Sequence, residues 1–204
     1  MPSLALHQLR VAAVAKSICD SFTSPIDTSS VMLTCLFHDM GNIIKSDLVA
    51  FPEFLKPEGP EFWKQVKDDF VRTYGTEEHE ATLIIAKEIG LSETVRTLIT
   101  NIGFSKLPAT RDGDSFEQKV SEYADLRAGP LGVLSMNERL EEARRRYANR
   151  NSDMPKDQQT YEEHLEAAEE IERQIFARTR IVSRDITEES IQPLIEKLRS
   201  YEIQ

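Results

Sequence analysis

The sequence predicts an all-α protein, and two observations carry this prediction. Glycine and proline are scarce, with 8 and 9 among 204 residues, while alanine, leucine, glutamate and arginine dominate long stretches, a composition that favours helix over sheet. Apolar residues recur at helical spacing, and no segment of useful length alternates as a strand does. The hydrophobic content of 40% is large enough to bury a real core.

The first half of the chain shows four helical patterns. Residues 4–19 form the first, with apolar positions on one face. Residues 28–40 are apolar nearly all round, which predicts a central helix. Pro60 suits the first turn of a third helix, and a fourth is expected from Glu77 to Ile89, where Gly90 ends it.

The middle of the chain is punctuated by caps and turn residues. Ser92 caps a short helix that ends near Asn101, and residues 102–113 are expected to form a loop. Asp114 and Glu117 resemble a capping box. They open a helix that we expect to end at the Gly-Pro pair 129–130.

The last third is strongly charged. Ser135 and Glu138 form a second capping box, opening an arginine-rich helix that reaches about Asn149. Between residues 154 and 180 the apolar stripe is thin, so this helix should rest on the body of the protein or on a second subunit, which would make a homo-oligomer. We therefore divide the chain into a helical domain, 1–130, and a helical C-terminal extension, 131–204.

Charge and cysteine usage restrict the partners. The formal net charge is −10, and an acidic surface repels phosphate backbones, which argues against nucleic acid. No apolar run approaches the ~18 residues of a bilayer span, and no signal peptide is recognisable, so no membrane partner is expected. Cys19 and Cys35, the only cysteines, lie in apolar helical patterns and fit a reducing compartment. The predicted location is the cytoplasm.

Three of the four histidines suggest a metal site. His7, His38 and His79 fall on apolar faces of separate helices, whereas His164 in EEHLE has the setting of a solvated surface residue. A lone histidine on such a face is usually a core residue. Three of them, one directly before Asp39, favour a metal instead. Imidazole and carboxylate ligands suit Mn, Fe, Co, Ni or Zn.

The ordered motifs resemble a known family. His7 followed by Arg10, then LFHDMGN, then the aspartate Asp125 in SEYADLRAG, is similar to the H…HD…D signature of the HD-domain superfamily of metal-dependent phosphohydrolases over residues 4–128. The resemblance implies an all-helical scaffold and a divalent metal held by His7, His38, Asp39 and Asp125. It also implies hydrolysis of a small phosphorylated substrate, a nucleotide being one candidate.

The chain departs from parts of the family pattern. Family members that cleave nucleoside monophosphates carry a glutamate three residues after the HD aspartate, where this chain has Asn42, which cannot transfer protons in general acid–base catalysis. The later acidic residue is kept as Asp47. Dinuclear members add two histidines; His79 matches the first, and Asn101 stands near the second. The resemblance therefore implies one metal ion per chain, with Mg as a further candidate.

The remaining candidate residues have competing interpretations. The resemblance makes Asp39 both a metal ligand and a group that orients water, and Asp47 a substrate-positioning or proton-accepting residue. Arg10, Arg127 and His79 are expected to contact phosphate; ordinary ion pairs and a core histidine are the alternatives.

Two other classes of protein are alternatives to the phosphohydrolase. The first is a non-catalytic HD-domain protein that binds a metal or a nucleotide, which Asn42 favours. The second is an HD-type oxygenase, which would need a second iron and more histidines than the sequence supplies.

Overall fold

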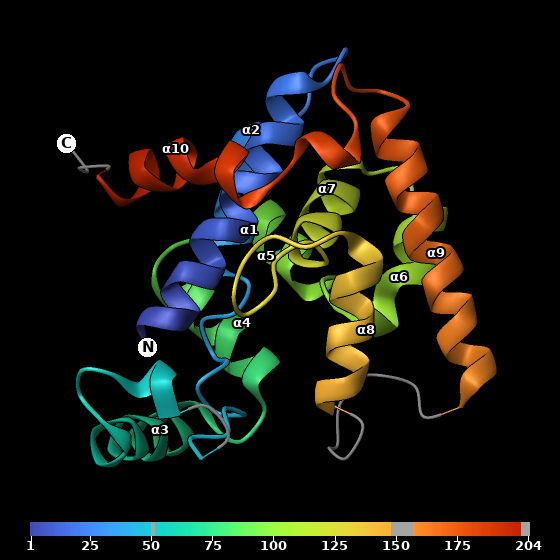
Figure 1. Ribbon diagram of the computed structural model, residues 1–204. Helices are drawn as coiled ribbons and strands as arrows, with labels where there is room; N and C mark the ends of the chain where they lie inside the picture. Colours follow the sequence, from blue (N-terminus) through green and yellow to red (C-terminus); the bar gives the residue numbers. More distant parts are fainter. Residues whose placement is uncertain (50–51, 148–156, 201–204) are drawn as a thin grey trace.

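The computed structural model describes residues 1–49, 52–147 and 157–200. The described residues form ten α-helices and three short 3₁₀ helices (Figure 1), and they contain isolated β-bridges but no strand. The all-α prediction is confirmed. The α-helices are α1 (Pro2–Ser21), α2 (Thr28–Phe37), α3 (Pro60–Tyr74), α4 (Glu78–Glu88), α5 (Glu93–Thr100), α6 (Leu107–Asp112), α7 (Phe116–Asp125), α8 (Met136–Tyr147), α9 (Gln158–Phe176) and α10 (Glu188–Arg199); the 3₁₀ helices are η1 (Pro52–Leu55), η2 (Phe104–Lys106) and η3 (Ser183–Asp185).

Helix α7 lies at the centre of the bundle, with α1, α2 and α9 packed against it. All of its residues from Gln118 to Ala124 are buried. Residues 11–15 of α1 are completely buried too, because the small side chains of Ala12, Ala13 and Ala15 let neighbouring helices approach closely. One hydrophobic core therefore joins α1, α2 and α7.

The C-terminal helices complete this same core. Helix α9 packs against α6 and α7, and α10 packs against α1. Ile171 and Ile175 of α9 and Ile191 and Ile195 of α10 are at most 1% exposed and belong to the cluster that contains Val11. The thin apolar stripe of α9 is thus covered within the chain and does not need a second subunit to bury it.

Gly41 brings the segment after α2 directly against α4. A Cβ at this position would lie 2.1 Å from the Glu78 carbonyl oxygen, so no larger residue fits without displacing backbone. The backbone N–H of Gly41 donates to Thr82 Oγ1 at 2.9 Å. Behind this contact, Ile43 and Ile44 pack with Ala81 in a small cluster that also holds the aromatic face of α3.

The structure corrects two expectations about the middle of the chain. Residues 104–112, predicted as loop, form η2 and α6, because Leu107 is completely buried and Pro108 is tolerated in a first helical turn. Helix α7 begins after Ser115, whose Oγ accepts the Gln118 N–H, and ends at Asp125 rather than at residues 129–130. The predicted helix end near Asn149 and the start of the stripe at Met154 lie outside the described residues.

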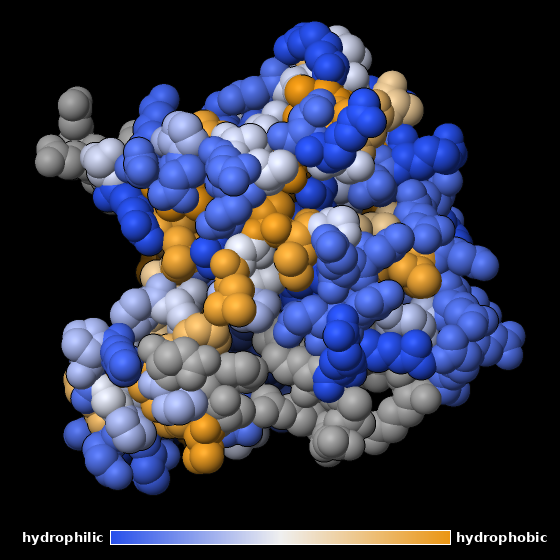
Figure 2. Space-filling view, viewed as in Figure 1, coloured by the Kyte–Doolittle hydropathy of each residue, from blue (hydrophilic) through white to orange (hydrophobic). Residues whose placement is uncertain are grey.

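The surface agrees with the acidic composition. The face drawn in Figure 2 is predominantly hydrophilic and is interrupted by small hydrophobic patches. Single apolar side chains such as Leu131 and Val49 are exposed, which is ordinary for a protein surface. Among the described helices, none has both the length and the apolar character of a membrane span.

Candidate metal centre

Four side chains from three helices converge at one place beside the core. His7 lies near the start of α1, His38 caps the end of α2 with Asp39 next to it, and Asp125 is the last residue of α7. The helix end explains how adjacent residues His38 and Asp39 can face one point, since successive residues of a regular helix diverge by about 100°. These are the four residues that the family signature singles out.

The distances are those of a compact ligand set. Ligand atoms of His7, His38 and Asp39 lie within 4.8 Å of one another. Asp125 Oδ1 lies 3.1 Å from His7 Nε2 and 3.4 Å from His38 Nε2. Asp39 Oδ2 lies 3.6 and 3.7 Å from the same two nitrogens. His7, His38 and Asp39 are therefore close enough to share one ion, and Asp125 adds a carboxylate oxygen beside both imidazoles.

The ring of His38 is oriented as a metal ligand requires. Its Nδ1 faces the Cys35 carbonyl oxygen at 2.9 Å, a contact that keeps a proton on Nδ1 and turns Nε2 towards the carboxylates of Asp39 and Asp125. That Nε2 is buried and has no hydrogen-bonding partner. A buried unpaired nitrogen is costly, and a cation at the centre would remove the cost, so the residues fit a divalent metal.

The electrostatics of the site also favour a cation. Burial lowers the pKa of His38, but the carboxylates of Asp39 and Asp125 outweigh it and raise the pKa to about 9. Burial raises the pKa of Asp125, yet the close approach of the His38 and His7 imidazoles outweighs burial and holds this pKa well below the ordinary value. The cluster therefore retains positive charge as a proton on His38, and a metal ion would replace that proton.

Asn42 contacts this cluster directly. Its Nδ2 donates a hydrogen bond to Asp39 Oδ2, the oxygen that faces His7 and His38. An amide donor fixes the orientation of a ligating carboxylate. The residue that replaces the expected glutamate therefore has a positioning role, although it cannot transfer a proton.

Asp125 lies on the polar face of α7, and the structure explains why this face is enclosed. A helical wheel treats the polar face of a helix as solvated, but α7 is covered on all sides by α1, α2, α5, α6 and α9. Only a quarter of the Asp125 side chain is exposed. This polar face is turned towards the interior of the bundle.

The two arginines expected near phosphate are engaged by the protein. Arg10 Nε donates to both carboxylate oxygens of Glu188 at 2.9 and 3.1 Å. Arg127 is 4% exposed. It donates to Tyr123 Oη and to the carbonyl oxygens of Leu134, Ser183 and Ile186. Both guanidinium groups are therefore held by acceptors within the protein.

The other two candidates lie on segments adjoining the centre. His79 is half-buried in the first turn of α4, the turn against which Gly41 packs. Asp47 is exposed in the segment that follows the HD pair, and its Oδ1 accepts a hydrogen bond from the Val49 N–H. Their predicted contacts with substrate remain predictions.

The interpretation of His164 as a solvated residue is wrong. Only 9% of this residue is exposed. Its ring stacks on Phe104, with centroids 5.2 Å apart, and its Nδ1 lies 2.6 Å from the Thr160 carbonyl oxygen. Phe104 belongs to the stretch that was predicted to be a loop, so the sequence pattern did not reveal the surface on which His164 packs.

Sequence reasoning missed Glu122. This residue lies three positions before Asp125, so the two share a face of α7, and it is 1% exposed. Its Oε2 accepts the Gly103 N–H at 3.0 Å. Burial, aided by the Asp125 carboxylate, raises the pKa of Glu122 to about 8. The spacing of 122 and 125 was readable in the sequence, but burial of α7 on all sides was not.

We expect Glu122→Gln to stabilise the protein at alkaline pH. The folded-state pKa of about 8 exceeds the ordinary glutamate value of 4.5, so the folded form binds more protons between these pH values and the unfolding free energy falls as pH rises. Glutamine keeps an acceptor for Gly103 but does not ionise. Above pH 8 the variant should gain on the order of 4–5 kcal/mol over the wild type, measured by urea unfolding from pH 5 to 9 with a chelator present.

Glu169→Gln, on the exposed side of α9, is the matched control and should leave the pH dependence as in the wild type. If Glu122→Gln and the wild type lost stability in parallel between pH 5 and 8, Glu122 would not be the buried titrating group.

Comparison with known proteins identifies a family for most of the chain. A family model described as HD domain matches residues 2–192. The match begins before His7, includes His38, Asp39 and Asp125, and extends through α9 into α10. No curated protein and no solved structure gives a significant match.

Proposed function

The chain belongs to the HD domain family, and on this premise we propose that it is a metal-dependent phosphohydrolase that cleaves a small phosphoester, a nucleotide being one candidate. The observation that carries the proposal is the convergence of His7, His38, Asp39 and Asp125, with the buried Nε2 of His38 left without a partner. Donor sets of imidazole and carboxylate suit one divalent ion among Mn, Fe, Co, Ni and Zn, with Mg as a weaker candidate.

A divalent ion bound by these four residues would supply Lewis-acid chemistry, polarising a phosphoryl oxygen and acidifying a water. The protein residues would orient the ligands, bind the phosphate group and transfer protons. Asn42 holds the Asp39 carboxylate in place, and the Cys35 carbonyl holds the ring of His38. Asp47, exposed on the adjoining segment, is our candidate for accepting or relaying a proton, and His79 is our candidate for contacting phosphate.

A second function is supported by one specific observation. Asn42 donates to Asp39 where family members that cleave nucleoside monophosphates carry a glutamate, so this chain lacks that acid. A protein that binds a metal or a nucleotide without turnover would keep the four ligands and tolerate asparagine here. The two functions differ in one measurable property, which is turnover.

The test is hydrolysis of a panel of phosphoesters, including nucleoside monophosphates, by protein reconstituted with Mn, Co or Zn. We expect turnover that a chelator abolishes and added metal restores. If Asp47 relays a proton, Asp47→Asn should retain the metal and lose about 10²–10⁴-fold in rate. Asp68→Asn, at an exposed aspartate on α3, is the matched control. Full metal occupancy with no turnover on any substrate would favour the binding protein.

A further inference from the structure

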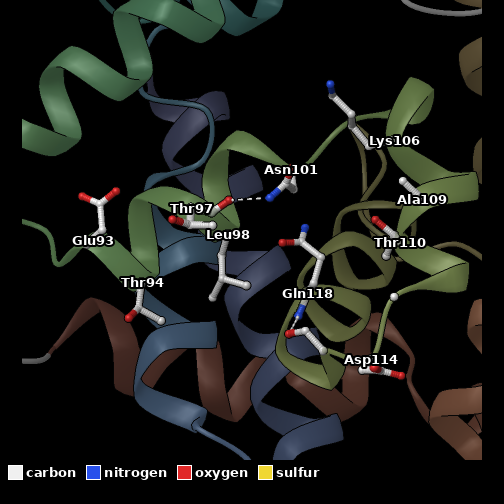
Figure 3. A pocket seen from close by; sticks show the side chains of 12 residues that line it. Glu93, Thr94, Thr97, Leu98, Asn101, Lys106, Ala109, Thr110, Asp114 and Gln118 are labelled. Carbon is white, nitrogen blue, oxygen red and sulfur yellow. Dashed lines mark hydrogen bonds between the residues drawn. The ribbon is translucent and has the colours of Figure 1, made fainter.

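A second cavity lies between α5, α6 and the start of α7 (Figure 3). Its volume is about 600 Å³, which is the size of a small-molecule site. Leu98 of α5 and Ala109 of α6 give it an apolar lining, and Thr97, Thr110 and Gln118 add hydroxyl and amide groups. Apolar walls with a few converging polar groups are typical of binding sites for small molecules.

Gln118 is the feature that points to a ligand. Only 9% of the residue is exposed, and its Nε2 is buried without a hydrogen-bonding partner among the described residues. Its backbone N–H is satisfied by Ser115 Oγ at 3.1 Å. Figure 3 shows the side chain extending from α7 into the space between Asn101 and Thr110. An unpaired buried donor destabilises a fold, whereas a ligand carrying an acceptor would pair it.

The charges around the cavity favour an uncharged ligand. Two carboxylates, Glu93 and Asp114, line it together with the ammonium group of Lys106. Glu93 forms an ion pair with Arg96, so the opposite charges near the rim are equal in number. The cavity therefore offers no net charge that would attract either an anionic or a cationic ligand. The groups that remain for recognition are apolar surface, hydroxyls and amides.

The cavity is separate from the metal centre, although α7 contributes to both. Gln118 and Asp125 are seven residues apart, which places them on one face of the helix and about 10 Å apart along its axis. Ser121 and Glu122 lie between them on this face and are at most 1% exposed. Protein atoms therefore cover the stretch that separates the two places.

We propose that this cavity binds a small uncharged heterocycle, whose carbonyl oxygen or ring nitrogen accepts a hydrogen bond from Gln118 Nε2. The faces of the ring would lie against Leu98 and Ala109. Polar edges of the ring would meet the threonine hydroxyls and Asn101, whose Nδ2 donates to the Thr97 carbonyl oxygen. The site is independent of phosphoester hydrolysis, because it uses none of the four candidate metal ligands.

The test is calorimetric titration of the full chain with uracil, adenine and nicotinamide as three uncharged ligands that differ in their acceptors. We expect saturable binding of at least one of them to the wild type. Gln118→Leu should weaken that binding about three- to tenfold. The same substitution removes an unpaired buried donor, so the Tm of this variant should stay unchanged or rise, which shows that lost binding is not lost folding.

Two further variants test where the ligand binds and whether a charged group of the cavity takes part in binding. Asp39→Ala should bind the same heterocycle as tightly as the wild type, and so should Asp114→Asn. The proposal would be overturned by the absence of saturable binding to the wild type or by equal affinity in Gln118→Leu. Loss of binding in Asp39→Ala would place the ligand at the metal centre instead, and loss in Asp114→Asn would show that the Asp114 carboxylate takes part in recognition, which contradicts a site that uses no charged group.

Discussion

Asp39→Ala is expected to lower metal affinity by at least about 100-fold, because even residues that only orient metal ligands contribute 10- to 100-fold. Asp39 Oδ2 faces both His7 and His38, so alanine removes one of the two carboxylate oxygens that lie beside both imidazoles. Phosphoester hydrolysis should disappear with the metal. The stabilisation that metal gives the wild type, about 2.7 kcal/mol at 100 times the dissociation constant, should disappear from the thermal unfolding of the variant.

Asn42→Ala removes the amide that orients the Asp39 carboxylate but leaves all four candidate ligands in place. Without the amide that donates to Asp39 Oδ2, metal affinity should fall about 10- to 100-fold while the ligand set stays complete. Titration with Mn or Co, followed by equilibrium dialysis, measures both variants. Wild-type affinity in Asp39→Ala would show that this aspartate is not a ligand, and wild-type affinity in Asn42→Ala would confine the amide to a local structural role.

Arg127→Met should destabilise the protein by about 3–5 kcal/mol, because several buried neutral acceptors lose their hydrogen-bond donor at a cost of about 1–3 kcal/mol each. Methionine fills similar volume but donates nothing. It would leave the carbonyl oxygens of Leu134, Ser183 and Ile186 without the hydrogen bonds that the guanidinium provides. These carbonyls belong to the segments that connect α7 to α8 and α9 to α10, so the C-terminal helices should loosen first.

Urea unfolding of Arg127→Met measures this loss, with Arg72→Met as the matched control. The Arg72 side chain is 74% exposed and pairs only at the surface with Asp69, a pair worth about 0–1 kcal/mol. A phosphate-binding arginine would behave differently. Arg127→Met would then keep its unfolding free energy and raise KM for the phosphoester.

The convergence of His7, His38, Asp39 and Asp125 was easier to predict from the sequence than what surrounds them. The order and helical setting of His7, His38, Asp39 and Asp125 are local properties of the chain, and the family match covers them. Their convergence depends on three helix ends meeting, and the sequence marked only one of these ends, through Gly41. Glycine is required at position 41 because the backbone there lies against the Glu78 carbonyl oxygen and leaves no space for a Cβ.

The acceptors of Arg10 and Arg127 could not be predicted from the sequence, because they lie in distant segments of the chain. Arg10 pairs with Glu188, 178 residues away, and Arg127 donates to Ser183 and Ile186, 56 and 59 residues away. Local patterns cannot reveal such acceptors, so both arginines looked available for phosphate. The burial of the polar face of α7 could not be recognised for the same reason, since the helices that cover it come from both ends of the chain.

Metal content is the measurement that tests the central claim most directly. We expect elemental analysis of the gently purified full chain to find about one divalent transition-metal ion per molecule, or to find one after incubation with Mn, Fe, Co, Ni or Zn. His38→Gln, which places an amide at the ligand position of the buried imidazole, should hold much less under the same conditions. A wild-type chain that carries no metal and takes up none from any of the five ions would contradict the assignment of His7, His38, Asp39 and Asp125 as a metal centre.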